Sequence, residues 1–446
     1  MNRNAVLCLS WLLFVQPLLA QPPMLAKPKA PTEIAVRFLD QLAAGNYQAA
    51  TAGFTEAMKE AAPPEKLAEI WTGLQGQLGP YRKRTGVRTE KQGLYDVVFA
   101  TTEFERSAAD LKVVVDEDGR VAGFFIVPPR PPEYEPPSYV NQGAFREREV
   151  TVGSGEWAVP GTLAMPVGQG PFPAVVLVHG SGPNDRDETV AAARPFRDLA
   201  WGLASRGIAV LRYEKSTRQH GARLGAIPNF TVRQETVDDA VAAAALLRGT
   251  EGIDPGRVYV LGHSLGAMLV PRIGEKDPKI AGFIVMAGAA RPLEDIILEQ
   301  VTYVAGLDGT VTGEETKQIE ELRQEIAKVK ALQPGATGSV LSAPASYWLD
   351  LKGYNPPEAA KALSRPLLVL QGERDYQVTL DNFEAWKKAL GDRKDVTFKS
   401  YPRLNHLFIE GEGQSGPAEY QKPGHVAEAV VADIAGWIKG RAAAKP

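Results

Sequence analysis

A serine between two glycines is the first feature of this sequence that could do chemistry. Gly262-His263-Ser264-Leu265-Gly266 follows the apolar segment Val258–Leu261 and precedes a helical pattern from Ala267 to about Glu275. A strand, a tight turn and a helix in this order raise a serine hydroxyl at a helix N-terminus, where backbone N–H groups stabilise negative charge. The pattern predicts that Ser264 is a nucleophile, with an ordinary glycine-rich turn as the alternative.

A serine hydroxyl is a weak nucleophile until a base removes its proton, and the chain has 5 histidines. His406 follows the predicted strand Val396–Ser400 in a short loop, from which it can reach the end of a sheet. His425, at the start of the last helical stretch, is the next choice. We therefore predict His406 as the base.

The histidine in turn needs a carboxylate that fixes its tautomer and stabilises the imidazolium. Asp375 lies in the loop after the buried strand pattern Leu367–Leu370 and is the predicted acid. Glu373 and Asp381 are rival carboxylates, and capping of the loop is the alternative role of Asp375. The chain order serine, aspartate, histidine matches one of the established triad orders.

Attack on a carbonyl also requires N–H donors for the oxyanion that forms. The segment His179-Gly180-Ser181-Gly182-Pro183 follows the apolar strand Ala174–Val178, and its glycines let backbone amides approach a substrate. The N–H groups of Ser181 and Leu265 are the predicted pair. His179 is expected to shape this loop through hydrogen bonds.

A charged stretch follows this glycine-rich loop. Asp185 and Asp187 flank Arg186, and two acids alone make a weak case for a metal site. We expect an internal ion pair with Arg186 in its place.

The arrangement of strand and helix patterns after residue 144 predicts the fold class. Short apolar segments alternate with helical stretches, and strands apolar on both faces are typical of a mostly parallel sheet covered by helices. We therefore predict an α/β domain over residues 144–441. Its expected strands are Phe145–Val152, Gly161–Met165, Ala174–Val178, Ala209–Arg212, Val258–Leu261, Phe283–Met286, Leu367–Leu370 and Val396–Ser400.

A smaller domain is predicted before it, over residues 32–127. Thr32 can cap a helix with one apolar face, and later segments with period-two alternation read as a strand meander. Helices followed by strands predict a small α+β domain. The proline-rich segment 128–143 is the expected linker.

About eighty residues interrupt the alternation of the larger domain. The segment at about 290–360 contains a charged helical pattern, Thr312–Leu332, and an aromatic cluster. An insertion of this size predicts a helical cap over a site, with a solvated decoration as the alternative. The aromatic residues Tyr347, Trp348 and Tyr354 are candidate pocket residues, although aromatics also belong to cores.

Composition and the N-terminal segment narrow the classes of function. The 50 Lys and Arg nearly balance the 53 Asp and Glu, which argues against a dedicated nucleic-acid binder. Residues 1–20 read as a signal peptide with cleavage near Ala20, so we expect export to the periplasm or the medium. Cleavage would remove Cys8 and leave no membrane span, thiol chemistry or disulfide in the mature chain.

These motifs together resemble the α/β-hydrolase superfamily over residues from about 145 to 440. The resemblance is specific at HGSGP (179–183), GHSLG (262–266) and the segment from QGERD to His406, and it is strongest to bacterial serine esterases and aminopeptidase-like hydrolases with a helical cap. Residues 32–127 are similar to a small NTF2-like domain of unknown function that precedes secreted members.

The resemblance implies hydrolysis of carboxylic esters through an acyl-enzyme, without a cofactor. We expect small-molecule esters with short to medium acyl chains, because the charged helix of the insertion argues against a long apolar groove. A serine peptidase or amidase is the alternative, since the same triad serves amides, and a non-catalytic binding protein is a third. The sequence leaves the natural substrate and the oligomeric state open.

Overall fold

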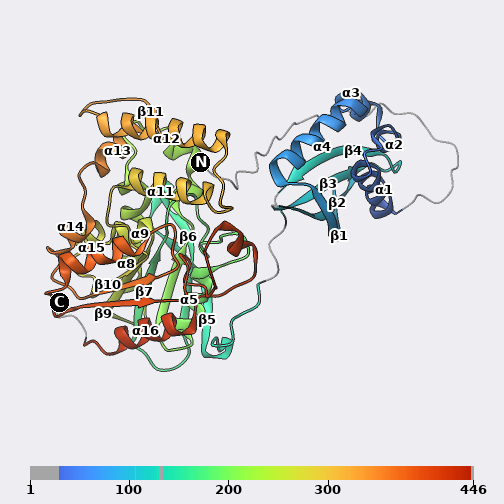
Figure 1. Cartoon of the computed structure of the whole chain (residues 1–446). Coiled ribbons are helices and arrows are strands. Elements are labelled where there is room, and N and C mark those ends of the chain that lie inside the picture. The colour runs from blue at the N-terminus through green and yellow to red at the C-terminus, as the bar shows by residue number, and fades with distance from the viewer. Residues whose placement is uncertain (1–29, 106, 128, 130–133, 443–446) are drawn as a thin grey trace. The chain divides into compact units, whose positions relative to one another are not determined.

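The computed structural model describes residues 30–105, 107–127, 129 and 134–442. The predicted signal peptide at residues 1–20 lies outside the described residues. The chain divides between residues 131 and 132 into two compact units (Figure 1), and each is described by itself.

In its described part, the first unit combines four helices with a four-stranded antiparallel sheet in the order β1-β2-β3-β4. Phe38 and Leu42 on the apolar face of the first helix are buried in one core with Trp71. This is the small α+β unit that the sequence predicts. Its elements are α1 (Pro31–Ala43), α2 (Tyr47–Thr51), α3 (Glu56–Ala61), α4 (Pro64–Leu78), β1 (Tyr81–Gln92), β2 (Tyr95–Phe104), β3 (Ala108–Val115) and β4 (Val121–Val127).

Two details of this unit differ from the sequence analysis. The prediction that Thr32 caps the first helix is wrong, because α1 begins at Pro31 and Ala30 is the N-cap residue. The Thr32 hydroxyl lies 3.1 Å from that of Thr89. Strand β1 was not predicted, because it is a mostly exposed edge strand whose pairing with β2, rather than an apolar pattern, defines it.

The second unit is built on an eight-stranded sheet in the order β14-β13-β10-β9-β7-β8-β6-β5. The six strands from β14 to β8 are parallel, and β6 and β5 continue the sheet in antiparallel pairs. The mostly parallel sheet is confirmed. Its strands are β5 (Phe145–Val152), β6 (Val159–Pro166), β7 (Phe172–Val178), β8 (Ala209–Tyr213), β9 (Ile253–His263), β10 (Gly282–Met286), β13 (Leu367–Gly372) and β14 (Val396–Tyr401).

Helices cover both faces of this sheet. Side chains alternate along β7, so that Val176 joins one core with α8, α10 and α15, while Val175 and Leu177 join the other core with α5 and α16. Burial on both faces explains the continuous apolar strands. The helices are α5 (Pro195–Ala204), α6 (Ser216–Gln219), α7 (Gly221–Leu224), α8 (Asp238–Arg248), α9 (Leu265–Met268), α10 (Val270–Lys276), α15 (Leu380–Leu390) and α16 (Glu428–Lys439), with a π-helical turn η3 (Arg233–Val237) before α8.

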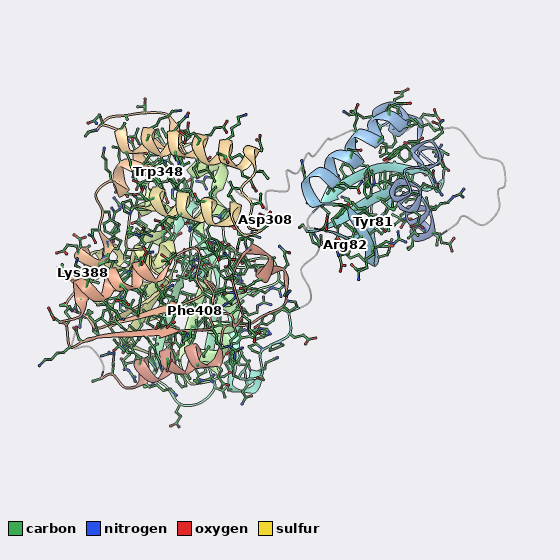
Figure 2. The ribbon with its side chains drawn as sticks, in the orientation of Figure 1. Tyr81, Arg82, Asp308, Trp348, Lys388 and Phe408 are labelled. Atoms are coloured by element: carbon green, nitrogen blue, oxygen red, sulfur yellow. The ribbon has the colours of Figure 1, made fainter. Side chains whose placement is uncertain are left out.

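The insertion between β10 and β13 is mainly helical. Its charged helix α12 starts with a capping box, in which the Thr312 hydroxyl and the Glu315 carboxylate each accept from the other's backbone N–H. Trp348, marked in Figure 2, donates its indole N–H to the Val340 carbonyl at 2.8 Å. The elements are α11 (Leu293–Ala305), α12 (Gly313–Ala331), β11 (Ser339–Val340), β12 (Ala343–Pro344), α13 (Ala345–Leu351) and α14 (Pro356–Ala360).

Candidate active site

Ser264 occupies the turn between β9 and α9 that the sequence predicts. Its φ of 53° and ψ of −114° form a backbone conformation that L-residues rarely adopt. The Ser264 N–H donates to the Met286 carbonyl at 3.0 Å, which ties the turn to β10. The turn therefore holds a strained serine at the carboxyl end of a central strand.

The glycines on either side of the serine allow this turn to pack backbone on backbone. A Cβ at Gly262 would overlap the Gly266 carbonyl group, and a Cβ at Gly266 would overlap the Val178 carbonyl oxygen at the end of β7. Any side chain at either position would thus push the turn away from its neighbours. Glycine at both positions is required by the space between β7, β9 and α9.

Asp375 and His406 form a buried pair in the loops that follow β13 and β14. His406 Nδ1 lies 2.7 Å from Asp375 Oδ2, and both residues are buried. The other carboxylate oxygen accepts from the backbone N–H groups of Gln377 and Val378 at 2.8 and 2.9 Å. The aspartate therefore caps its own loop and orients the imidazole at the same time.

The rival acids and the rival base lie in other surroundings. Glu373 is exposed and accepts from Ser400 Oγ at 2.7 Å, while Asp381 is exposed in the first turn of α15. His425 Nδ1 lies 3.1 Å from Asp198 Oδ1, and this carboxylate raises the pKa of His425. The structure thus brings neither rival acid to His406.

The histidine before the serine joins the loop of the predicted base to the turn. His263 Nε2 lies 2.9 Å from the backbone carbonyl oxygen of His406, and the two imidazole centroids are 4.7 Å apart. Because His263 and Ser264 are consecutive, this contact brings the His406 loop beside the serine turn. Residues 264, 375 and 406, which are distant along the chain, therefore gather at one end of the sheet.

The glycine-rich loop after β7 lies against the serine. A Cβ built on Gly180 would be 3.0 Å from Ser264 Cβ and 3.6 Å from its Oγ. Ser181 is exposed, and Leu265 is the first residue of α9, so its N–H has no carbonyl one turn earlier in the helix. The two predicted oxyanion donors thus lie on the two segments that flank the serine.

A second buried carboxylate–histidine pair supports these segments, and the sequence analysis did not predict it. Glu188 Oε2 lies 2.9 Å from His263 Nδ1, and Glu188 Oε1 accepts from the Gly180 N–H at 2.6 Å. Burial opposes charge on both groups, but their mutual attraction outweighs it, which lowers the pKa of Glu188 and raises that of His263. This ion pair connects the glycine-rich loop to the serine turn.

His179 is buried beneath the same loop. Burial lowers its pKa to about 4, so it is neutral at pH 7. Its ring packs 5.0 Å from Phe196 and 5.2 Å from Tyr213, measured between ring centroids. In this environment the uncharged ring supports the loop by packing against two aromatic side chains.

The prediction that Arg186 pairs with an acid of its own stretch, Asp185 or Asp187, is wrong. Arg186 pairs with Glu149 and Glu214, at 2.7 and 2.9 Å. Asp187 pairs with Arg197 and Arg212, and Asp185 accepts from the Thr189 backbone N–H. Residues 185–188 form a turn in which the Glu188 N–H donates to the Asp185 carbonyl at 2.9 Å, so adjacent side chains point to different elements.

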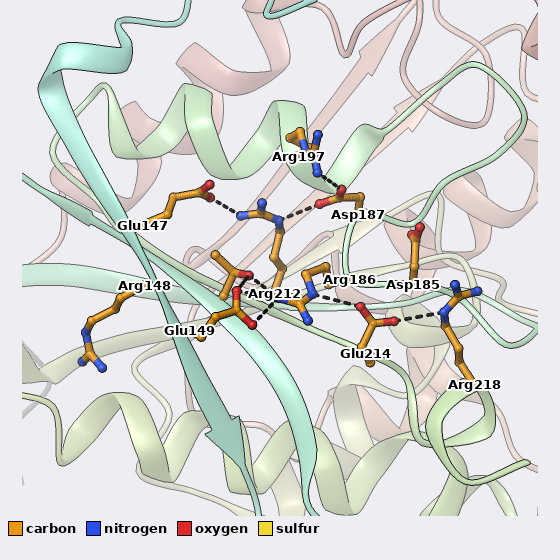
Figure 3. Close-up of a pocket in the computed structure, with 11 residues that line it drawn as sticks. Glu147, Arg148, Glu149, Asp185, Arg186, Asp187, Arg197, Arg212, Glu214 and Arg218 are labelled. Atoms are coloured by element: carbon orange, nitrogen blue, oxygen red, sulfur yellow. Dashed lines mark hydrogen bonds and ion pairs between the residues drawn. The ribbon is translucent and has the colours of Figure 1, made fainter. Parts of the chain in front are cut away.

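These charges line a cavity of about 510 Å³ (Figure 3). Acidic side chains from β5 and from residues 185–187 face the arginines across it, including the buried Arg212. The paired guanidinium groups are already neutralised by carboxylates. We therefore interpret the charges around this cavity as a structural network and not as a binding site.

The aromatic residues of the insertion have internal partners. The Tyr347 hydroxyl donates to Glu235 at 2.8 Å, and the Tyr354 hydroxyl donates to the Met268 carbonyl at 3.0 Å. Tyr347 and Trp348 are buried in the main core, and Tyr354 packs against it. Their contact with a substrate stays a prediction.

The insertion does contact the loop that carries the aspartate. Tyr303 of α11 stacks on Tyr376 with ring centroids 5.0 Å apart, and Gln300 Nε2 donates to the Gln377 carbonyl at 3.0 Å. Helix α11 therefore packs at the carboxyl end of β13, next to Asp375.

None of the described helices has both the length and the apolar character needed to cross a membrane. Within the same residues, no three His, Cys, Asp or Glu side chains gather as a set that could hold a metal ion.

Two family models match the chain. Residues 35–124 match a protein of unknown function (DUF3887), and residues 175–418 match the alpha/beta hydrolase family. The chain belongs to the alpha/beta hydrolase family, as its sheet and its serine turn indicate.

Particular relatives extend the similarity across both units. The chain is 40% identical to Esterase EstD of Thermotoga maritima over 401 residues. This alignment covers 90% of this chain and 93% of that protein. It is 27% identical over 252 residues to a monoacylglycerol lipase of Mycolicibacterium smegmatis, covering 54% of this chain and 84% of the lipase. A solved Pyrococcus furiosus esterase is 16% identical, with a TM-score of 0.43, and covers 68% of this chain and 96% of its own.

Replacing Gly266 by alanine tests the packing of the serine turn. The added methyl group would overlap the Val178 carbonyl, so Gly266→Ala is expected to lower the free energy of unfolding by about 1–3 kcal/mol and to reduce turnover. Urea unfolding of the full chain, followed by tryptophan fluorescence, measures the change. Gly436→Ala is the matched control, because nothing lies within 4 Å of a Cβ there and alanine favours helix α16 by about 0.5–1 kcal/mol. Equal stability of the two variants would contradict the prediction.

Replacing Glu188 by glutamine tests the buried ion pair through pH. The raised pKa of His263 means that the pair stabilises the fold below the unfolded pKa of histidine, about 6.5, and loses this effect as pH rises through the folded pKa. The pKa of Glu188 is lowered, so the stabilisation by the pair is lost at the acidic end as pH falls through the folded pKa of this carboxyl. We therefore expect the difference in Tm between wild type and Glu188→Gln to favour wild type most at pH 5–6.5 and to shrink toward pH 9.

Differential scanning calorimetry from pH 5 to pH 9 measures this difference. The exposed Glu156→Gln, which removes a surface pair with Arg223, is the control and is expected to give a constant difference. A constant difference for Glu188→Gln as well would refute the charged pair.

Proposed function

We propose that this protein is a serine carboxylesterase in which Ser264 is the nucleophile, His406 the base and Asp375 the residue that orients the base. The observation that carries the proposal is the buried 2.7 Å contact between Asp375 Oδ2 and His406 Nδ1, in loops gathered at the serine turn. The carboxylate only accepts, so His406 Nδ1 bears the proton and its Nε2 is left to act as a base.

The chemistry then follows in two halves. His406 takes the proton of Ser264 Oγ as that oxygen attacks the ester carbonyl, and the imidazolium is stabilised by Asp375. The proton passes to the leaving alcohol, which departs and leaves an acyl-serine. Water, deprotonated by His406, releases the acid and restores the serine.

The oxyanion of each tetrahedral intermediate is proposed to rest on the N–H groups of Ser181 and Leu265. Support comes from the closeness of Gly180 to Ser264 and from the position of Leu265 at the start of α9. Removing one fixed donor of this kind lowers kcat by about 10²- to 10³-fold in acyl-transfer enzymes. No cofactor is required for any of these steps.

The finer proposals concern substrate and place. Similarity to Esterase EstD along 90% of the chain favours esters over amides. The charged helix α12 supports short to medium acyl chains over long ones. The sequence of residues 1–20 supports export to the periplasm or the medium. A panel of nitrophenyl esters of increasing acyl length, with an aminoacyl anilide beside it, tests the substrate class.

Replacing Ser264 by alanine is the first test of the mechanism. Alanine keeps the packing of the turn but removes the nucleophilic oxygen, so kcat for nitrophenyl butyrate is expected to fall by at least about 10⁴-fold. The exposed Ser154→Ala is the matched control and should retain wild-type kcat. Mass spectrometry after treatment with a fluorophosphonate should find the label on Ser264. A fully active Ser264→Ala would eliminate the proposed mechanism.

Replacing Asp375 by asparagine tests the orientation of the base. The amide oxygen can still accept from the loop N–H groups, but the NH₂ then faces His406 and favours the wrong tautomer, so kcat should fall by about 10⁴-fold. The same NH₂ meets Gln371 Nε2, which donates to Asp375 Oδ2 at 3.2 Å, so a modest loss of stability accompanies the loss of activity. Glu373→Gln and Asp381→Asn, made at the rival carboxylates, should keep kcat within about threefold of wild type. A larger loss in either control than in Asp375→Asn would assign the acid elsewhere.

A further inference from the structure

A buried lysine contacts the glycine-rich loop at the Gly180 carbonyl, whereas Glu188 contacts the Gly180 N–H. Lys215 follows β8 and has an exposed fraction of 1%. Its Nζ donates to the Gly180 carbonyl at 2.7 Å and to Glu235 Oε1 at 2.7 Å. Lysine is almost never fully buried unless its charge is paired. Here one of the two hydrogen bonds of the ammonium group goes to a carboxylate and the other to a backbone carbonyl.

The carbonyl that Lys215 contacts belongs to the peptide unit that carries the Ser181 N–H. A trans peptide is planar, and its C=O and N–H point in opposite directions. Fixing the Gly180 oxygen therefore fixes the direction of the Ser181 N–H. The Asn184 side chain also donates to the Gly180 oxygen, at 3.1 Å, so two donors hold this plane from the carbonyl side.

The preceding peptide unit is held as well. The Gly180 N–H donates to Glu188 at 2.6 Å, so the residue is fixed at its nitrogen by a carboxylate and at its oxygen by an ammonium group. A cation on the carbonyl also polarises the amide, which makes the N–H of the same plane a stronger donor. Both effects favour an oxyanion at the Ser181 N–H.

We propose that Lys215, with Asn184, is a positioning residue of the oxyanion hole, which aims and polarises the Ser181 N–H through the Gly180 carbonyl. This inference rests on the proposed function, because it assigns a role in the same site. The alternative is a purely structural ion pair between Lys215 and Glu235. A structural pair would affect stability alone, whereas a positioning residue affects the transition state selectively.

The test uses Lys215→Met in the full chain, since methionine keeps much of the buried volume and removes the charge. We expect kcat for nitrophenyl butyrate to fall about 10- to 100-fold while KM changes less than about threefold, because the contact acts on the oxyanion. The inhibition constant of a trifluoromethyl ketone, which forms a tetrahedral adduct with the serine, should rise by the same factor. Lys352→Met is the matched control, because Lys352 also donates to backbone carbonyls, but within the insertion.

Each result then has one meaning. A folded Lys215→Met with wild-type kcat and wild-type ketone affinity, beside an inactive Ser264→Ala, overturns this inference and leaves the proposed function standing. An active Ser264→Ala overturns both. If Lys215→Met fails to fold, the half-buried Asn184→Ala decides: parallel losses of about 3- to 10-fold in kcat and ketone affinity support the inference, and wild-type values for both overturn it.

Discussion

The close packing of bare backbone around Ser264 is the constraint on which the site depends. Strand β7 ends against Gly266, and the serine turn closes against Gly262, with no room for a Cβ at either residue. This contact brings the loop after β7 to the serine side chain and permits the φ of 53° at Ser264. The strain of one residue is balanced by the packing of a central sheet on both faces.

Buried charge then fixes what the backbone packing brings together. Asp375 accepts a hydrogen bond from His406. Glu188 contacts His263 and the Gly180 N–H, and Lys215 donates to the Gly180 carbonyl. Each carboxylate or ammonium group is paired, as burial of charge demands. Buried pairs of this kind add little net stability, but they tolerate few alternative geometries, which suits a site where donors must point at a small target.

The local motifs predicted most of what lies close in sequence to a strand end. Each member of the proposed triad follows the carboxyl end of a parallel strand, namely Ser264, Asp375 and His406. Their order and spacing in the sequence were therefore enough to select them as candidates. Strand β1 was not predicted, because its sequence has only a weak alternation of apolar and polar residues. The sheet order itself could be expected only as a class, because pairing between strands depends on contacts that no local window contains.

The supporting charges could not be predicted in the same way. Arg186 pairs with Glu149 on β5 and with Glu214 after β8, and not with its sequence neighbours. Lys215 is 35 positions from Gly180 along the chain. The sequence did contain one signal for Lys215, which is a charged residue two positions after the buried strand β8. Its partners, however, depend on tertiary structure. Local patterns thus identify reacting groups better than the groups that aim them.

The hydrogen bond from Tyr347 to Glu235 has a practical consequence. Glu235 is also the partner of Lys215, so a phenol from the insertion is the outermost member of a chain of contacts that ends at the Gly180 peptide. Engineers who exchange the segment between β10 and β13 for one from another enzyme, to alter which substrates enter, would remove that phenol. A graft that restores a hydroxyl at this place should keep its catalytic rate better than one that does not.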